Sequence, residues 1–102
     1  MTLRLLQEAR DETKEAYDWY DDNRFGLGEE FLHELEIVYE RIEEHPRRSR
    51  KIEIPELEHR EFRQQMLRRF PYKVIFEIQE SAIVVLAVMH ARRRPYYWAD
   101  RT

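Results

Sequence analysis

The side chains best suited to chemistry lie close to the C-terminus, between residues 90 and 98. An apolar stretch ends there in a histidine, three consecutive arginines and an aromatic cluster. Guanidinium groups bind phosphates and carboxylates through paired N–H donors, and aromatic rings can stack on bases. Two further arginines precede a predicted turn at residues 70 and 71. These residues predict a surface that binds a macromolecular target or a partner: Arg68, Arg69, His90, Arg92, Arg93, Arg94, Tyr96, Tyr97 and Trp98.

Each of these groups also has a purely structural interpretation. The three consecutive arginines could form a solvated tail or pair with helix acids such as Glu29, Glu30 or Glu34. Arg68 and Arg69 could be solvated charges at a turn. His90 has a reference pKa near neutrality, which suits acid–base chemistry, but a histidine at a strand end commonly binds a backbone group instead. The aromatic residues could pack over the helices or against a partner protein rather than stack on bases.

The elements that position this surface are predicted to be strands. Residues 72–78 alternate between two faces and include aromatic and β-branched residues, which is typical of a half-buried strand. Residues 83–89 are apolar throughout, which predicts a strand covered on both faces. From residue 61 the chain fits either a strand or a helix, because glutamine, methionine, leucine and arginine are good helix formers. We favour a strand, since residues 70 and 71 would then form a hairpin turn.

Two helices are expected earlier in the chain. From about residue 8, apolar residues recur on one face, and the acidic residues 11, 12, 15 and 18 cover the other side. Gly26 and Gly28 end this helix. A second helix is expected from about residue 27 to 44, and Pro46 stops it. The short loop predicts an antiparallel hairpin, with a second apolar stripe formed by Phe31, Leu32, Leu35, Val38, Tyr39 and Ile42.

The length of 102 residues predicts one domain, residues 1–102, in the α+β class. Residues 2–6 are a candidate edge strand. Residues 46–60 form a polar connector with a brief strand at 51–54, which Pro55 keeps away from the centre of a sheet.

Composition excludes several classes of function. The chain has no cysteine, no apolar signal segment and no apolar run long enough to span a bilayer, so we expect a cytoplasmic protein with no membrane partner. Its four histidines show no metal-ligand spacing and it has no glycine-rich phosphate loop, so we expect neither a metal nor a small-molecule cofactor. The net charge is −3, but residues 1–50 carry −6 and residues 51–102 carry +3. This asymmetry suggests one face directed at an anionic partner, although an even scatter of solvated charges is an equal alternative.

Taken in order, these landmarks resemble the RelE/ParE superfamily of toxins from type II toxin–antitoxin systems, often labelled plasmid stabilisation proteins. The resemblance rests on AYDWY at residues 16–20, GLG at 26–28, Phe31 and Leu35, Ile42 and Pro46. It continues through RRFPY at 68–72, IVVLAVMH at 83–90 and RRxPxxW at 92–98. It implies a β-α-α-β-β-β fold in which a helical hairpin packs on an antiparallel sheet. It also implies a growth-inhibiting toxin that a cognate antitoxin neutralises.

The resemblance leaves the target open. Members of the ParE type poison DNA gyrase, and the ending HxRRxPxxW is more similar to that branch. Members of the RelE type cleave mRNA on the ribosome, and a RelE-like reading would make Arg63, Arg69, Arg92 and Tyr97 catalytic. Cations would balance the charge of the pentacovalent phosphate, and another group would take the 2′-OH proton. The lysines of the RelE type have no clear counterpart here, and a non-toxic interaction module is a third reading. Candidate antitoxin contacts are Leu3, Leu5 and Tyr39.

Overall fold

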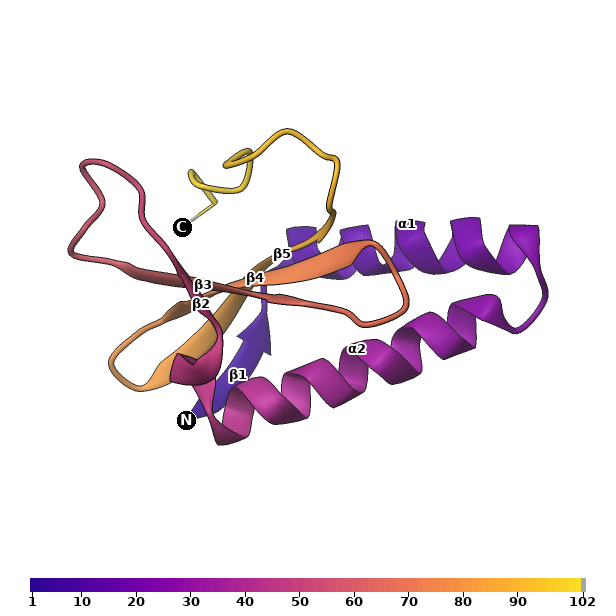
Figure 1. Ribbon diagram of the computed structural model, residues 1–102, viewed down its shortest axis with the longest axis horizontal. Coiled ribbons are helices and arrows are strands. Elements are labelled where there is room, and N and C mark those ends of the chain that lie inside the picture. The colour runs from indigo at the N-terminus through magenta and orange to yellow at the C-terminus, as the bar shows by residue number, and fades with distance from the viewer. Residues whose placement is uncertain (102) are drawn as a thin grey trace.

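The computed structural model describes residues 1–101 and forms one mixed sheet, a helical hairpin and a C-terminal segment. The helices are α1 (Gln7–Asn23) and α2 (Leu27–Glu44), followed by a short 3-10 turn, η1 (Pro46–Arg48). The strands are β1 (Thr2–Leu5), β2 (Arg50–Ile52), β3 (Glu61–Met66), β4 (Tyr72–Ile78) and β5 (Ala82–His90). Figure 1 shows α2 running below the sheet while the C-terminal segment, residues 91–101, crosses above it.

The sheet has the order β1-β5-β4-β3-β2, so the apolar β5 lies inside it, between β1 and β4. Strands β2 to β5 pair antiparallel in turn, which confirms the predicted α+β class and the strand at residue 61. The C-terminal strands form the predicted antiparallel sheet, and the N-terminal strand β1 joins it parallel to β5, which makes the whole sheet mixed. The helical hairpin separates β1 from the other strands in sequence, and β1 joins the edge that β5 leaves open. The short β2 adds a fifth strand at the opposite edge.

Both faces of the sheet are covered, which explains why β5 is apolar from Ala82 to Met89. One face packs against the helices, and its core includes Ala16, Phe31, Leu35 and Val85. The other face lies under the loop after β2 and under the C-terminal segment. A register shift near Ile75 and Phe76 leaves β5 with one extra residue, as in a β-bulge.

The turn between the helices is built around one carboxylate. Asp21 Oδ1 accepts hydrogen bonds from the backbone N–H groups of Gly26 and Gly28, at 3.0 and 3.2 Å. Gly26 has φ +90°, a left-handed conformation that glycine adopts without steric cost. Gly28 lies so close to Tyr17 that an added Cβ would be 2.8 Å from that ring. The turn therefore holds α1 and α2 side by side, as the sequence predicts.

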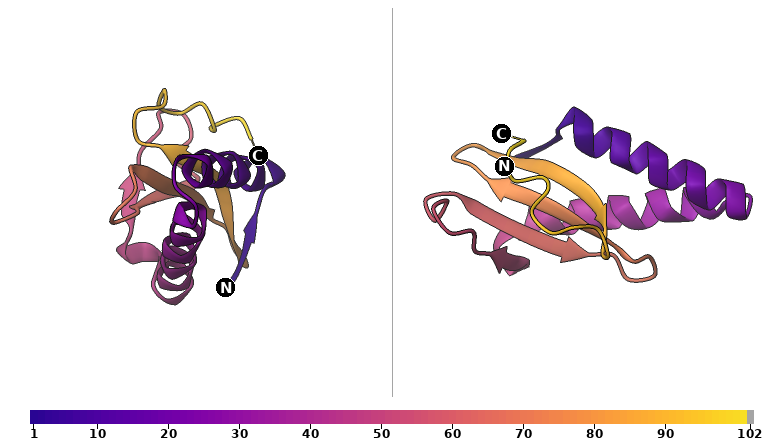
Figure 2. Two further views of the ribbon diagram at one scale, coloured as in Figure 1. Left: turned by 90° about the vertical axis from the view of Figure 1, so that its right-hand side faces the viewer. Right: turned by 90° about the horizontal axis from the view of Figure 1, so that it is seen from above.

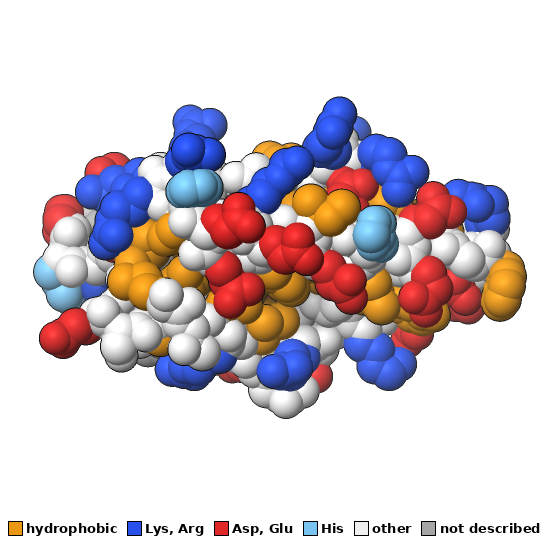
Figure 3. All heavy atoms as spheres, turned by 90° about the horizontal axis from the view of Figure 1, so that it is seen from below, with side chains coloured by type: hydrophobic (Ala, Val, Ile, Leu, Met, Phe, Trp, Pro, Cys, Tyr) orange, Lys and Arg blue, Asp and Glu red, His pale blue; other side chains and the backbone are white. Residues whose placement is uncertain are grey.

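The face on which α2 lies is acidic along its middle and basic along its rims (Figure 3). Hydrophobic side chains are visible between these charges. Among residues 1–101, no helix combines the length and apolar character needed to cross a bilayer.

Candidate target-binding site

The predicted arginine clusters come together at one end of the sheet. The N–H of Ala91 donates to the carbonyl of Pro71 at 2.8 Å, and His90 is the strand partner of Tyr72. The turn between β3 and β4 therefore lies beside the end of β5, as Figure 2 shows. This places Arg68 and Arg69 at the same end of the molecule as the arginines that follow β5.

Across residues 1–101, three of these arginines combine an exposed side chain with the lack of an ion pair. Arg68, Arg92 and Arg94 are exposed, and within the described residues none of them forms an ion pair. The Nδ1 atom of His90 accepts a hydrogen bond from the N–H of Arg92 at 3.0 Å, and its ring meets Tyr72 edge to face. The backbone partner expected for His90 is thus present, and this nitrogen fixes the start of the C-terminal segment.

Arg93 is held differently from its two neighbours. Its Nη1 lies 3.0 Å from Glu12 Oε2, and its guanidinium stacks 3.6 Å from the centre of the Tyr97 ring. The alternative that an arginine pairs with a helix acid is therefore correct for Arg93, but the acid is on α1 rather than α2. Half of its side chain remains exposed.

Glu12 joins α1 to the edge of β5 and to the C-terminal segment. The expectation that Glu12 covers the solvent side of α1 is wrong, because its side chain is only 10% exposed. It accepts hydrogen bonds from the N–H of Val88 at 3.0 Å and from Arg101 at 2.9 and 3.1 Å. Arg101 also donates to the carbonyl of Leu86 at 2.8 Å. Because β1 pairs with β5 only as far as Val85, these two side chains satisfy backbone groups that β1 leaves unpaired.

Tyr97 belongs to the same network. Its hydroxyl donates to Glu12 Oε2 at 2.5 Å. Burial raises the pKa of Tyr97, and the hydrogen bond to the Glu12 carboxylate raises it further. A phenol in this state donates a hydrogen bond rather than accepting a proton, so the arrangement does not suit a general base.

Trp98 faces the interior and not a target. It is 2% exposed and packs edge to face on Phe62, with ring centres 5.3 Å apart, on the sheet face opposite the helices. The alternative that Trp98 packs over the helices is therefore wrong, because it packs on the other face of the sheet. Tyr96 is 54% exposed and has a left-handed backbone with φ 64°, so it is the aromatic residue of this cluster most accessible to a partner.

The remaining candidate catalytic residues, Arg63 and Arg69, each form ion pairs and hydrogen bonds within the protein. Arg69 donates to Glu34 from its backbone N–H at 2.7 Å and from Nε at 3.1 Å. Burial alone would raise the pKa of Glu34, but the hydrogen bonds from Arg69 outweigh it and the pKa is lowered. Arg63 pairs with Glu61 at 2.9 Å and donates to the carbonyl of Ser49 at 2.8 Å. The four residues proposed for RNA cleavage are thus not brought together around one exposed group.

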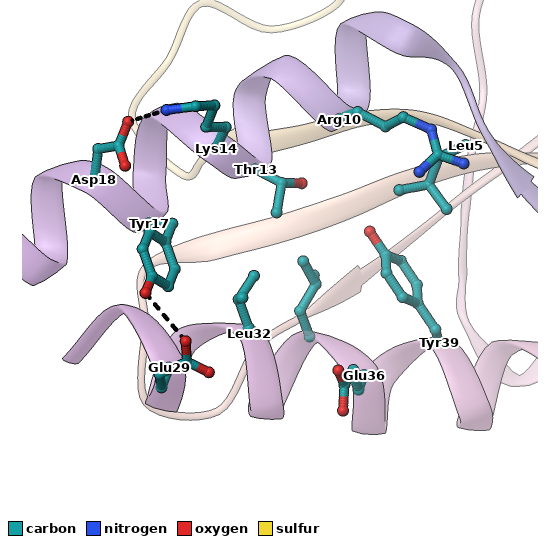
Figure 4. A pocket seen from close by; sticks show the side chains of 11 residues that line it. Leu5, Arg10, Thr13, Lys14, Tyr17, Asp18, Glu29, Leu32, Glu36 and Tyr39 are labelled. Carbon is teal, nitrogen blue, oxygen red and sulfur yellow. Dashed lines mark hydrogen bonds and ion pairs between the residues drawn. The ribbon is translucent and has the colours of Figure 1, made fainter. Parts of the chain in front are cut away.

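A separate groove of about 620 Å³ runs between the two helices (Figure 4). At one end the Tyr17 hydroxyl donates to Glu29 at 3.0 Å, and Leu32 lies in the middle. At the other end Tyr39 points toward Leu5, and its hydroxyl is buried with no hydrogen-bond partner among residues 1–101. Two of the three candidate antitoxin contacts, Leu5 and Tyr39, therefore line one groove. The third, Leu3, packs against the core.

The comparisons with known proteins agree with this fold. A family model described as "ParE toxin of type II toxin-antitoxin system, parDE" matches residues 3–95. A solved chain described as "Chromosomal ParDE TA system from P. aeruginosa" is similar with a TM-score of 0.75 at 17% identity. The match covers 88% of this chain and 95% of that one. No curated protein matches the sequence at a significant level.

Proposed function

Because this chain belongs to the ParE toxin family of type II toxin–antitoxin systems, we propose that it inhibits DNA gyrase and that a cognate antitoxin neutralises it. The family match over residues 3–95 is the observation that carries this proposal. The unpaired arginines Arg68, Arg92 and Arg94 support a binding surface at one end of the sheet. The fixed positions of Arg63, Arg69 and Tyr97 offer no support for cleavage of RNA.

Expression alone and with an antitoxin tests this proposal. We expect expression in bacteria to stop growth, and expression of the antitoxin from the same operon to restore it. Gyrase inhibition predicts accumulated gyrase–DNA cleavage complexes while translated mRNA stays intact. Cuts within codons, detected by primer extension, would instead establish the RelE-like nuclease, and normal growth at confirmed soluble expression would favour a non-toxic interaction module.

The double variant Arg92→Ala, Arg94→Ala tests the proposed target surface. Both side chains are exposed and unpaired within residues 1–101, so their removal should lower toxicity and leave the unfolding free energy nearly unchanged. Arg50→Ala is a matched control, because Arg50 is an exposed arginine on β2 at the far edge of the sheet. Equal loss of toxicity in the control would argue for a general effect of charge and against a defined surface.

We propose that an apolar segment of the antitoxin enters the groove between α1 and α2, a common mode of peptide recognition. Leu32→Gln should weaken antitoxin binding and the rescue of growth, because Leu32 lines that groove. Ile37→Gln is the matched control, since Ile37 is another half-buried residue of α2 and lines a different hollow. The measurement is the yield of antitoxin that co-purifies with each toxin variant, compared between variants of equal unfolding free energy. We expect a lower yield for Leu32→Gln than for Ile37→Gln.

A further inference from the structure

A second large cavity lies where the C-terminal half of α1 meets the ends of β4 and β5. Its volume is about 680 Å³, and it shares no lining residue with the groove between the helices. Four of its lining side chains are aromatic and two are carboxylates, and neither a lysine nor an arginine is among them: Glu15, Trp19, Tyr20, Asp22, Pro71, Tyr72 and His90.

The aromatic walls form a continuous series of rings. Trp19 meets Tyr20 edge to face at 5.2 Å, Tyr20 lies 6.0 Å from Tyr72, and Tyr72 lies 5.2 Å from His90. Trp19 is nevertheless 62% exposed, whereas Trp98 is 2% exposed. A tryptophan on an open helix face contributes little to a core, and it is a residue type that often dominates binding at protein interfaces.

The two carboxylates lie on the same helix face as this tryptophan. Glu15, Trp19 and Asp22 are spaced by four and three residues, so their side chains are neighbours along α1. Both carboxylates are exposed, and in the part of the chain that the structure describes neither forms an ion pair.

The two carboxylates that line the cavity are not accompanied by a lysine or an arginine in its lining. Burial raises the pKa of Tyr72, and the negative charges of Glu15 and Glu12 raise it further. Arg93 lines the adjacent hollow together with Glu15, Tyr72 and His90, and it is paired with Glu12. Glu15 and Asp22 therefore have no counterion among the side chains that line the cavity.

We propose that this cavity binds an arginine or lysine side chain presented by a polypeptide segment of a partner protein. The cation would lie over the faces of Trp19 and Tyr72, where the ring quadrupole attracts it, and would donate hydrogen bonds to Glu15 and Asp22. Charge complementarity selects this occupant, because two carboxylates repel phosphates and so disfavour nucleic acid or an anionic membrane. The site is distinct from Arg92 and Arg94 and does not depend on gyrase as the target.

Small probes test the chemistry directly on the full chain. Methylguanidinium and N-methylurea have similar shapes and differ in charge, so they can be titrated at constant ionic strength while amide and indole NMR signals are recorded. We expect saturable shifts at Trp19, Tyr72 and His90 with methylguanidinium alone. The peptide acetyl-Ala-Arg-Ala-amide should give the same pattern at lower concentration, and acetyl-Ala-Gln-Ala-amide should give none.

Substitutions at exposed positions should leave the fold of the protein intact. Trp19→Leu and Glu15→Gln should each weaken binding of the arginine peptide by roughly two- to fivefold, the range expected for one exposed cation–π contact or ion pair. Phe25→Leu is the matched control, because Phe25 is 92% exposed at the hairpin turn and does not line the cavity. Circular dichroism confirms that each variant keeps its fold.

Several results would overturn the proposal. Equal shifts with N-methylurea, shifts spread over all acidic surfaces, or equal weakening by Phe25→Leu would each show that no cation site exists here. A dimer seen by sedimentation velocity that Trp19→Leu dissociates would make a second copy of this chain the occupant, which also contradicts a separate partner.

Discussion

Replacing Glu12 with alanine should destabilise the protein more than replacing any other exposed or partly exposed acid. The carboxylate accepts hydrogen bonds from the N–H of Val88 on β5, from the Tyr97 hydroxyl, and from Arg93 and Arg101. Its loss would remove the link between α1, the edge of β5 and the C-terminal segment in one step.

The magnitude follows from the burial of each partner. The side chains of Glu12 and Arg101 are 10% and 14% exposed, so the substitution leaves a mostly buried guanidinium without its counterion, at a cost of about 3–5 kcal/mol. The unpaired N–H of Val88 has a desolvation penalty of about 1–3 kcal/mol when water cannot reach it. Arg93 is half exposed and contributes less than about 1 kcal/mol. Allowing for water entry, we expect a total loss of about 3–5 kcal/mol, a large part of the stability of a small domain.

Urea unfolding followed by circular dichroism measures this loss. Glu12→Gln keeps an acceptor for the N–H of Val88 and should cost less, about 1–3 kcal/mol. Arg101→Ala should be clearly more destabilising than Arg93→Ala, because only Arg101 is mostly buried and also bonds the carbonyl of Leu86. If Glu12→Ala costs under about 1 kcal/mol, or Arg93→Ala matches Arg101→Ala, the reasoning from burial is refuted.

Release of the C-terminal segment from the sheet can be detected by tryptophan fluorescence. The chain has two tryptophans, and Trp19→Phe leaves the buried Trp98 as the sole reporter. In that background Glu12→Ala should shift the fluorescence of Trp98 to longer wavelength before urea is added. An unshifted spectrum would show that Trp98 and Phe62 hold the segment without Glu12.

Three further predictions concern other parts of the fold. The hydrogen bond from Arg60 lowers the pKa of Glu77, so the ionised pair stabilises the protein above the unfolded glutamate pKa of about 4.3. This stabilisation is lost as the pH falls through the lower pKa of the folded state. The difference in unfolding free energy between wild type and Glu77→Gln, measured in urea, should therefore become smaller below about pH 4. Gly28→Ala should destabilise by about 1–2 kcal/mol in thermal unfolding, because the new Cβ would lie 2.8 Å from the Tyr17 ring and 3.0 Å from its carbonyl oxygen. Tyr39→Phe should be neutral or stabilising by up to about 1 kcal/mol in the same assay, because it removes a buried hydroxyl that has no partner.

Local patterns in the sequence were sufficient to predict most elements. The 3.6-residue periodicity of α2 predicts its bounds, and the alternation in β4 and the apolar run in β5 predict both strands. Glycine and proline mark the intervening turns. These signals depend on neighbours within a few residues, which is why they are visible in one sequence.

Contacts between distant residues were not predictable in the same way. The parallel direction of β1 and the burial of Glu12 both depend on β5, which lies more than 70 residues away along the chain. One signal could have indicated the network around Glu12. A four-residue β1 cannot pair with all of the nine-residue β5, so polar side chains had to satisfy the rest of that edge.

The division of the arginines limits how this protein can bind its target. Between residues 60 and 101 the structure shows five arginines held by carboxylates and three without an ion pair, so most of the basic excess of this half is neutralised inside the fold. Binding by electrostatic attraction to nucleic acid requires many free cations and is strongly salt-dependent. A small set of cations at one end of a rigid sheet suits directional contacts with carboxylates of a protein surface instead. The geometry therefore favours a protein target bound by few contacts, and the proposed contacts are the exposed Arg68, Arg92 and Arg94.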